Sequence, residues 1–311
     1  MQHRESDRSK MRYLVIGLGI QGKKRKYSAG TNMVGVVDPI SPEADYKEIE
    51  SVPLDSFDAA FVCTPDSPKL RILEYLVKNK KHALVEKPLF SETSNSLREL
   101  LLLSEECKTT IYTAYNHRFE PHFEKMRDLI SSGELGKIYD FRMFYGNGTA
   151  RDVRDSEWRD KGAGVLPDLG SHLLDTMRFW FPNEGFKFKR LSYQKFENRA
   201  PDHVEFRSNC SFQASLTATL LSWRNSFRVE ILAEKGSAHI DCLCKWGPST
   251  LTHRTRALPS GRPAEKQWTL TEPDPTWKKE FSYFNKLSTT GESNLENDIW
   301  INDILKELGC E

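Results

Sequence analysis

The chain has 311 residues and a formal net charge of +1, from 45 Lys and Arg against 44 Asp and Glu. This length favours two domains over a single core, and the balanced charge provides no overall field that would attract nucleic acid or an anionic membrane. No apolar run approaches the roughly 20 residues that a membrane span requires, and residues 1–10 lack the apolar core of a signal peptide. We therefore expect a cytoplasmic protein with a small or locally recognised partner.

The six cysteines are scattered along the chain. Cys242 and Cys244 form the only close pair, and they alternate like neighbours on one face of a strand. In a chain of this size the pattern favours reduced thiols over a disulfide framework. Because no metal ligands occur at a recognisable spacing, we expect no metal site.

Residues 1–10 hold no aliphatic side chain and are expected to form a disordered lead. After them, short apolar runs alternate with amphipathic stretches. The runs expected to form strands are "RYLVI" (12–16), "MVGVVD" (33–38), "AAFVC" (59–63), "HALVE" (82–86) and "TIYTAY" (110–115). Residues 67–80 and 94–107 carry the apolar spacing of helices. Strands that alternate with helices predict βαβ units and a parallel sheet.

The pattern changes near residue 119, where a helix with an apolar face precedes a series of strand-like stretches. These stretches are 137–146, 186–197, 203–212, 215–223, 227–234 and 237–244. Consecutive strands without helices between them predict a large, mostly antiparallel sheet. Further helices are expected at about 165–180, 275–288 and 294–308, and an exposed loop at 257–266. The second half is thus predicted to be an α+β domain.

"YLVIGLGIQGKK" places Gly17, Gly19 and Gly22 directly after the first strand and at the start of a helix. The three glycines allow a tight turn, close approach of a pyrophosphate and close packing of helix on strand. Asp38 ends the second strand, where its carboxylate can accept hydrogen bonds from ribose hydroxyls and would repel a 2′-phosphate. The motif therefore predicts a site for NAD rather than NADP, and an unrelated glycine-rich turn is the disfavoured alternative.

Two features near this loop are unusual. The basic run 23–26 follows the last glycine, and it fits a solvated helix face as well as a contact to phosphate. The segment from Asp38 to the strand at Ala59 is short, which suggests that a full second helix and third strand are missing and that the adenine pocket is reshaped.

Chemically useful side chains follow two further strands. Cys63, Thr64 and Pro65 end one of them at the edge where parallel sheets hold ligands, although a plain strand-to-helix turn fits equally. Glu86 and Lys87 end the next strand ahead of a proline. Lys87 could donate a hydrogen bond to a substrate hydroxyl and stabilise a developing oxyanion, or it could only pair with Glu86.

"GVLPDLGSHLLD" places Asp168, His172 and Asp175 on one face of a predicted helix. A histidine oriented by a neighbouring carboxylate can take the proton from an alcohol as hydride leaves its carbon, since its ordinary pKa is near neutrality. A purely structural histidine is the alternative, and the stretch alone does not decide between them.

Together these motifs resemble the Gfo/Idh/MocA oxidoreductase family, which carries nucleotide-binding glycines, an E-K-P triplet and a D-x-G-x-H-x-x-D stretch. The resemblance runs from about Arg12 to the end of the chain and implies a Rossmann domain at 11–118 and a substrate-binding and oligomerisation α+β domain with an open-faced sheet at 119–311. Family members usually act on sugars, inositols or nucleotide sugars with NAD(P). Ala163 and Pro167 depart from a stretch that is often richer in glycine.

The resemblance assigns roles to individual residues. The implied catalytic residues are Lys87, Asp168 and His172. The expected cofactor contacts are Gly17, Gly19, Ile20, Gln21, Gly22, Asp38, Cys63, Thr64, Pro65, Glu86, Lys87 and Asn116. The expected substrate contacts are Lys87, Asn116, Arg151, Trp158, Arg159, Asp168 and His172.

The stretch 145–175 and the compact first domain look like the branch of UDP-N-acetylglucosamine 3-dehydrogenases, which make a 3-keto sugar for an aminotransferase in amino-sugar and lipopolysaccharide biosynthesis. Arg151, Arg154, Trp158 and Arg159 could hold a diphosphate and a flat base, or could form a solvated loop. The resemblance implies a homodimer or homotetramer. A free-sugar or inositol dehydrogenase and a non-catalytic NAD-sensing regulator remain the alternatives.

Overall fold

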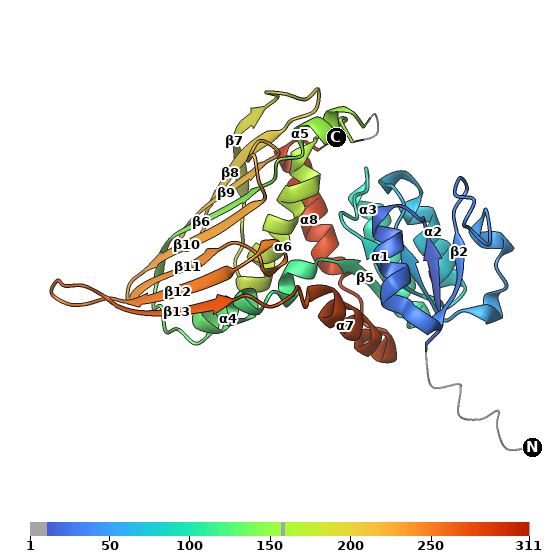
Figure 1. The fold of residues 1–311 in the computed structure, drawn as a ribbon, viewed down its shortest axis with the longest axis horizontal. Helices are drawn as coiled ribbons and strands as arrows, with labels where there is room; N and C mark the ends of the chain where they lie inside the picture. The colour runs from blue at the N-terminus through green and yellow to red at the C-terminus, as the bar shows by residue number, and fades with distance from the viewer. Residues whose placement is uncertain (1–10, 157–158, 311) are drawn as a thin grey trace, which may run out of the picture. The chain divides into compact units, whose positions relative to one another are not determined.

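The structure is a computed structural model that describes residues 11–156 and 159–310. The chain divides into two compact units (Figure 1). Within the described residues, unit 1 comprises 11–114 and Trp277–Asn302, and unit 2 comprises Tyr115–Thr276 and 303–310. The division after Ala114 lies close to the predicted boundary at 118, but the return of Trp277–Asn302 to unit 1 differs from the sequence-based assignment. The predicted disordered lead, 1–10, lies outside the described residues.

Unit 1 contains a five-stranded parallel sheet in the order β2-β1-β3-β4-β5. Its strands are β1 (Tyr13–Ile16), β2 (Met33–Val37), β3 (Ala59–Val62), β4 (His82–Glu86) and β5 (Ile111–Ala114). Every residue of β1, β3 and β5 is buried, as expected where helices cover both faces of a parallel sheet. All five predicted strands are therefore confirmed.

Three helices connect these strands: α1 (Ile20–Ala29), α2 (Asp66–Lys78) and α3 (Ser94–Cys107). Helix α2 buries Ile72, Leu73, Leu76 and Val77, which join the apolar core of the sheet. Between β2 and β3 the described chain forms only the 3₁₀ turns Ile49–Ser51 and Leu54–Ser56. This confirms the inference that a full helix is missing there.

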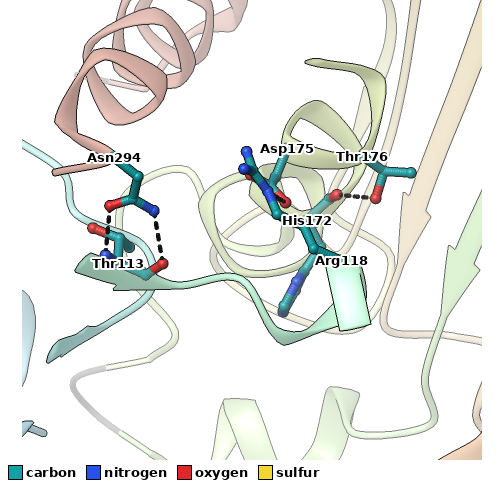
Figure 2. A network of polar contacts seen from close by, with 6 residues as sticks. All are labelled: Thr113, Arg118, His172, Asp175, Thr176 and Asn294. Carbon is teal, nitrogen blue, oxygen red and sulfur yellow. Dashed lines mark hydrogen bonds and ion pairs between the residues drawn. The ribbon is translucent and has the colours of Figure 1, made fainter. Parts of the chain in front are cut away.

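The edge of β5 is covered by the segment that returns to unit 1. The Asn294 side chain accepts a hydrogen bond from Thr113 N–H (2.8 Å) and donates one to Thr113 C=O (3.0 Å), as Figure 2 shows. The N–H and C=O of Ile111 bind Ser293 Oγ (3.1 Å) and Asn294 N–H (3.2 Å). An uncovered strand edge would leave these groups without partners. The contacts explain why α7 (Thr276–Thr290) and the first half of α8 (Leu295–Leu308) belong with the parallel sheet.

Unit 2 is built on an eight-stranded sheet in the order β13-β12-β11-β10-β6-β9-β8-β7, in which only β6 and β9 pair in parallel. Its strands are β6 (Ile138–Gly146), β7 (Phe188–Gln194), β8 (His203–Asn209), β9 (Gln213–Thr219), β10 (Ser226–Ala233), β11 (Gly236–Asp241), β12 (Ser249–Thr255) and β13 (Ala264–Leu270). The mostly antiparallel sheet is thus confirmed. The sequence analysis missed β12 and β13, and its predicted loop 257–266 overlaps the start of β13.

Buried residues alternate with more exposed ones along strands of this sheet, as in β8, where Val204, Phe206 and Ser208 are the buried set. Helices α4 (Pro121–Ser131) and α6 (Ser171–Trp180) belong to the same unit, which also contains the short helix α5 (Ala150–Arg154). The predicted helix 165–180 is confirmed, but its first turn, Leu166–Gly170, is a π-helix. Such turns are rare and occur often at functional sites.

All six cysteines are free thiols. Strand β11 ends at Asp241, so Cys242 and Cys244 do not alternate on a strand as the sequence indicated. Cys244 instead begins the 3₁₀ turn Cys244–Trp246. Among the described residues, His, Cys, Asp and Glu form no cluster able to hold a metal ion. No helix in the described part of the chain has both the length and the apolar character needed to cross a membrane.

We predict that Asn294→Ala lowers the free energy of unfolding by about 2 kcal/mol or more, because it leaves two groups of the buried Thr113 backbone unpaired. Asn294→Asp keeps the acceptor for Thr113 N–H and should cost less. Urea unfolding measures both. Asn95→Ala is the control, since Asn95 is exposed and binds only Glu99 on the same helix face (2.6 Å). Equal stability of the Asn294 and Asn95 alanine variants would contradict the proposed edge cover.

Candidate active site

The loop between β1 and α1 is too tightly packed for side chains at two of its glycines. Gly17 adopts a φ of +89° and donates a hydrogen bond to Val37 C=O (2.8 Å). A Cβ on Gly17 would lie 2.8 Å from Cys63 O, and one on Gly22 would lie 1.9 Å from Gly17 O. Both positions therefore require glycine, as the sequence analysis inferred from the motif.

Gly19 has a different environment. A Cβ added at Gly19 would meet no atom within 4 Å, so the surface at this point is open. Gly19 caps α1 without a side-chain hydrogen bond, and the next residue, Ile20, is 78% exposed. The N-terminus of a helix that begins in this way offers backbone N–H groups to an anion.

Asp38 is fixed beside this loop. Its Oδ2 accepts a hydrogen bond from Leu18 N–H (2.7 Å), and its Oδ1 accepts from Ile40 N–H (2.9 Å) and Ser41 N–H (2.8 Å). Burial raises the pKa of the Asp38 carboxyl, but the three N–H donors outweigh it and hold the pKa below its usual value. The carboxylate is therefore charged and oriented near the helix N-terminus.

Thr64 follows β3 at the same edge of the sheet. Its Oγ1 is buried and has no hydrogen-bond partner among the described residues. A buried hydroxyl of this kind fits a site where a bound molecule supplies the missing partner. The open position at Gly19, the oriented carboxylate of Asp38 and the hydroxyl of Thr64 together fit a dinucleotide cofactor.

Glu86 is the last residue of β4, Lys87 follows it directly, and the Lys87–Pro88 peptide bond is cis. Glu86 Oε1 accepts a hydrogen bond from Nε of Arg25 in α1 (2.8 Å), and Arg25 Nη2 also pairs with Glu280 Oε2 in α7 (2.7 Å). Arg25 is 1% exposed, although it belongs to the basic run 23–26. The sequence allowed this run to be a solvated helix face or a contact to phosphate. For Arg25 both interpretations were wrong, because its guanidinium is buried and bound to carboxylates.

The buried Arg25 is stabilised as an ion. Burial alone would lower the pKa of its guanidinium, but Glu280 and Glu86 raise it above the ordinary value. The guanidinium also lies 4.4 Å from the ring centroid of Trp277. Glu86, which the sequence analysis assigned either to the cofactor or to Lys87, is thus bound by a permanently charged partner.

In unit 2, the 3₁₀ turn Asn116–Phe119 carries the residue expected to contact substrate or nicotinamide. Asn116 Nδ2 donates a hydrogen bond to Thr276 Oγ1 (3.1 Å), which fixes the orientation of the amide. The two following residues, His117 and Arg118, both contact the helix that carries His172, as described next.

His172 lies at the start of α6 and is 5% exposed. Its ring stacks on His117 with centroids 4.0 Å apart and planes inclined by 16°. Tyr115 and Tyr145 lie around the same imidazole, with ring centroids at 6.1 and 5.8 Å. The aromatic surroundings restrict rotation of the ring and exclude water from its faces. His117 was missed by the sequence analysis, although it directly follows Asn116.

Arg118 binds Asp175, the last residue of the D-x-G-x-H-x-x-D stretch. Its guanidinium contacts the carboxylate at 2.6 to 2.9 Å, and Asp175 is fully buried (Figure 2). Thr176 Oγ1 in the next position donates to the backbone carbonyl of His172 (2.8 Å). Asp175 therefore joins the turn 116–119 to α6, which places the stacked His117 against His172.

The remaining predicted residues of unit 2 are Asp168, Arg159, Arg151 and Trp158. Asp168 belongs to the π-helix, and its Oδ2 lies 3.7 Å from Arg159 Nη2, with both side chains about one third exposed. Arg151 in α5 is exposed. Trp158 lies outside the described residues, so its predicted contact with a base stays a prediction.

The predicted cofactor residues thus lie in unit 1 except Asn116, and the predicted substrate residues that the structure describes lie in unit 2 except Lys87. In unit 1 the carboxyl ends of β1 to β4 bring the glycine loop, Asp38, Thr64 and Lys87 to one edge of the sheet. In unit 2 the turn 116–119 places Asn116 directly before His117 and Arg118, which contact His172 and Asp175 of α6.

The chain spans about half the length of the curated relatives it matches. It is 24% identical to an inositol 2-dehydrogenase of Rhizobium meliloti over 188 residues, which cover 56% of each chain. A solved structure of a UDP-N-acetylglucosamine 3-dehydrogenase from Acidithiobacillus ferrooxidans matches with a TM-score of 0.77 and 17% identity, covering 96% of both chains.

A solved inositol dehydrogenase homologue from Azotobacter vinelandii, in complex with NADH and myo-inositol, matches with a TM-score of 0.73 and 16% identity, covering 96% of this chain and 95% of that one. At these identities the two structures support the fold alone.

Two models of one family match the chain directly. Residues 11–115 match the model of the oxidoreductase family with an NAD-binding Rossmann fold, and residues 123–239 match the model of the GFO/IDH/MocA C-terminal domain. Together they cover more than half of the chain, including the glycine loop, the E-K-P triplet and the His172 helix, and the chain therefore belongs to the Gfo/Idh/MocA family of oxidoreductases.

Proposed function

We propose that this protein oxidises a secondary alcohol of a sugar with NAD as the hydride acceptor. One observation carries the proposal. The open backbone at Gly19, which follows β1, and Lys87, which follows β4, lie at the same edge of one parallel sheet. Ligands of such sheets bind at the carboxyl ends of the strands.

Three residues have separate roles in the proposed reaction. Bound NAD would supply the carbon that accepts the hydride. Lys87 donates a hydrogen bond to the substrate oxygen, and His172 accepts the hydroxyl proton as the C–H hydride leaves, so that a ketone, NADH and a protonated imidazole result. Asp168 orients His172 in this proposal. The stacking of His117 on His172 supports the role of base, because it holds the imidazole in one orientation.

The substrate that we propose is a nucleotide sugar, with oxidation at C3 of UDP-N-acetylglucosamine to the 3-keto sugar. Support comes from the resemblance of the stretch 145–175 to the UDP-N-acetylglucosamine 3-dehydrogenase branch. Two arginines, Arg159 beside Asp168 of the π-helix and Arg151 in α5, suit a diphosphate. In this proposal the enzyme works as a homodimer or homotetramer and delivers its ketone to an aminotransferase.

Oxidation of a free polyol is the second candidate, because inositol dehydrogenases occur among the relatives with similar sequences. The two candidates differ in whether the substrate carries a diphosphate.

We predict that UDP-N-acetylglucosamine with NAD raises the absorbance of the reduced cofactor and that myo-inositol does not. An aminotransferase with an amino donor should be included to remove the ketone. The reverse result would favour the polyol, and no turnover of either sugar would favour an NAD-sensing regulator.

Lys87→Met and His172→Ala should each lower turnover by about 100-fold or more, because each removes a proton donor or acceptor at the substrate oxygen. NAD should still bind both variants, as titration calorimetry would measure. His239→Ala provides the control, since His239 lies on β11 and binds Ser237 within the same strand (2.8 Å). Full activity of either site variant would overturn the assignment of that residue.

Asp38→Ala should weaken NAD binding by about tenfold or more, since it removes a charged acceptor for the ribose hydroxyls. Asp38→Asn should reduce the preference for NAD over NADP, because it removes the charge that repels a 2′-phosphate. Calorimetry with both cofactors measures the change. Asp45→Ala is a matched control, as Asp45 also accepts a backbone hydrogen bond, from Val36 N–H (2.9 Å). Unchanged NAD affinity in Asp38→Ala would contradict the proposed contact.

A further inference from the structure

Two buried cations bind the residues on either side of Lys87. Arg25 binds the Glu86 carboxylate that precedes it, and Lys69 binds the Pro88 carbonyl that follows it (Nζ to O, 2.7 Å). Both cations are almost completely inaccessible, Arg25 at 1% and Lys69 at 2% exposure. Lys and Arg are rarely buried to this extent unless they are paired, so their position at this turn requires an explanation.

Arg25 connects three elements of unit 1. It lies in α1, the helix that follows the glycine loop, and it binds Glu86 at the end of β4 and Glu280 in α7. The planar guanidinium can serve two carboxylates at once through different nitrogens. Because a buried ion that loses one partner is strongly destabilised, this arrangement tolerates little movement of Glu86.

Lys69 acts from the other side. It lies in the first turn of α2, the helix that begins directly after Thr64 and Pro65. Its Nζ also binds Asp66 Oδ1 at the start of the same helix (2.7 Å). One ammonium thus connects the beginning of α2 to the main chain at Pro88. The turn that carries Lys87 is therefore held by α1 and α2, two helices that follow strands at the carboxyl edge of the sheet.

We infer that Arg25 and Lys69 are positioning residues for Lys87, holding the Glu86–Pro88 turn from both sides so that the Lys87 ammonium has one fixed direction. This inference rests on the proposed function, in which Lys87 meets the cofactor and the substrate oxygen. Neither cation touches either molecule in this scheme. A misplaced catalytic group loses rate even when binding is intact, so the two residues should affect turnover more than cofactor affinity.

Lys69→Met tests the inference with a matched control at the opposite end of β4. Lys81, directly before β4, also donates to a backbone carbonyl, that of Phe57 (2.8 Å). Lys81→Met therefore removes the same kind of bond, from a lysine ammonium to a backbone carbonyl, near the opposite end of β4 from Lys87. Arg25→Lys is the second variant, because it keeps a positive charge between Glu86 and Glu280 and avoids leaving two buried carboxylates without a cation.

The first measurement needs no sugar. Acetic anhydride labels lysine amines, and mass spectrometry follows the rate at Lys87 with and without NAD. NAD should slow the labelling of Lys87 in the unmodified protein and in Lys81→Met. This protection should be lost in Lys69→Met and reduced in Arg25→Lys, although calorimetry shows NAD bound to both. Undiminished protection in both variants would overturn the inference, since a merely structural role lowers stability without freeing Lys87.

The second measurement compares kcat and KM with UDP-N-acetylglucosamine or myo-inositol, whichever is oxidised. In Lys69→Met we expect kcat to fall by about tenfold to 100-fold with little change in KM for NAD, and in Lys81→Met we expect both to stay unchanged. If the unmodified protein oxidises neither sugar but NAD protection of Lys87 still depends on Lys69, the proposed substrate is wrong and the positioning role stands. A wild-type kcat in both Lys69→Met and Arg25→Lys would contradict the positioning role.

Discussion

The buried ion cluster of Arg25, Glu86 and Glu280 is the interaction on which unit 1 most depends. Burying a permanently charged guanidinium to 1% exposure is unfavourable unless carboxylates pair with it, and here they come from β4 and α7. Helix α1, the end of β4 and α7 must therefore keep their relative positions. Helix α1 follows the glycine loop, β4 ends next to Lys87, and α7 belongs to the segment that returns to the sheet. The ion pairs of Arg25 therefore hold together the elements around the proposed cofactor site.

The return of residues 277–302 to unit 1 has two physical causes. Glu280 supplies the second carboxylate for Arg25, and Ser293 with Asn294 binds the backbone groups of β5 that no strand covers. A parallel sheet is normally buried on both faces, but its edge strands still need partners for their N–H and C=O groups. The parallel sheet is thus completed by chain that lies about 180 residues further along the sequence.

Local pattern was sufficient to predict much of this molecule. The five strands of unit 1, the missing helix after β2 and the glycine loop follow from apolar runs and spacing within a few residues. Arg25, by contrast, was placed in a solvated or phosphate-binding run, because its partner Glu86 lies 61 residues away and periodicity carries no information about that distance. His117 was missed for the same reason, since its stacking on His172 joins two separate elements. Strands β12 and β13 have too few apolar residues to be recognised by composition.

Carboxylates accompany both cations that bind the neighbours of Lys87, the proposed catalytic lysine. Arg25 is paired with two carboxylates, Glu86 and Glu280, and Lys69 is paired with the half-exposed carboxylate of Asp66. Around Arg25 all three partners are largely buried, and separating these charges inside the protein is unfavourable. The ion pairs therefore act mainly by fixing the positions of the elements that carry them. In the proposed reaction the N-terminus of α1 attracts the anionic cofactor, and Lys87 itself donates the hydrogen bond to the substrate oxygen.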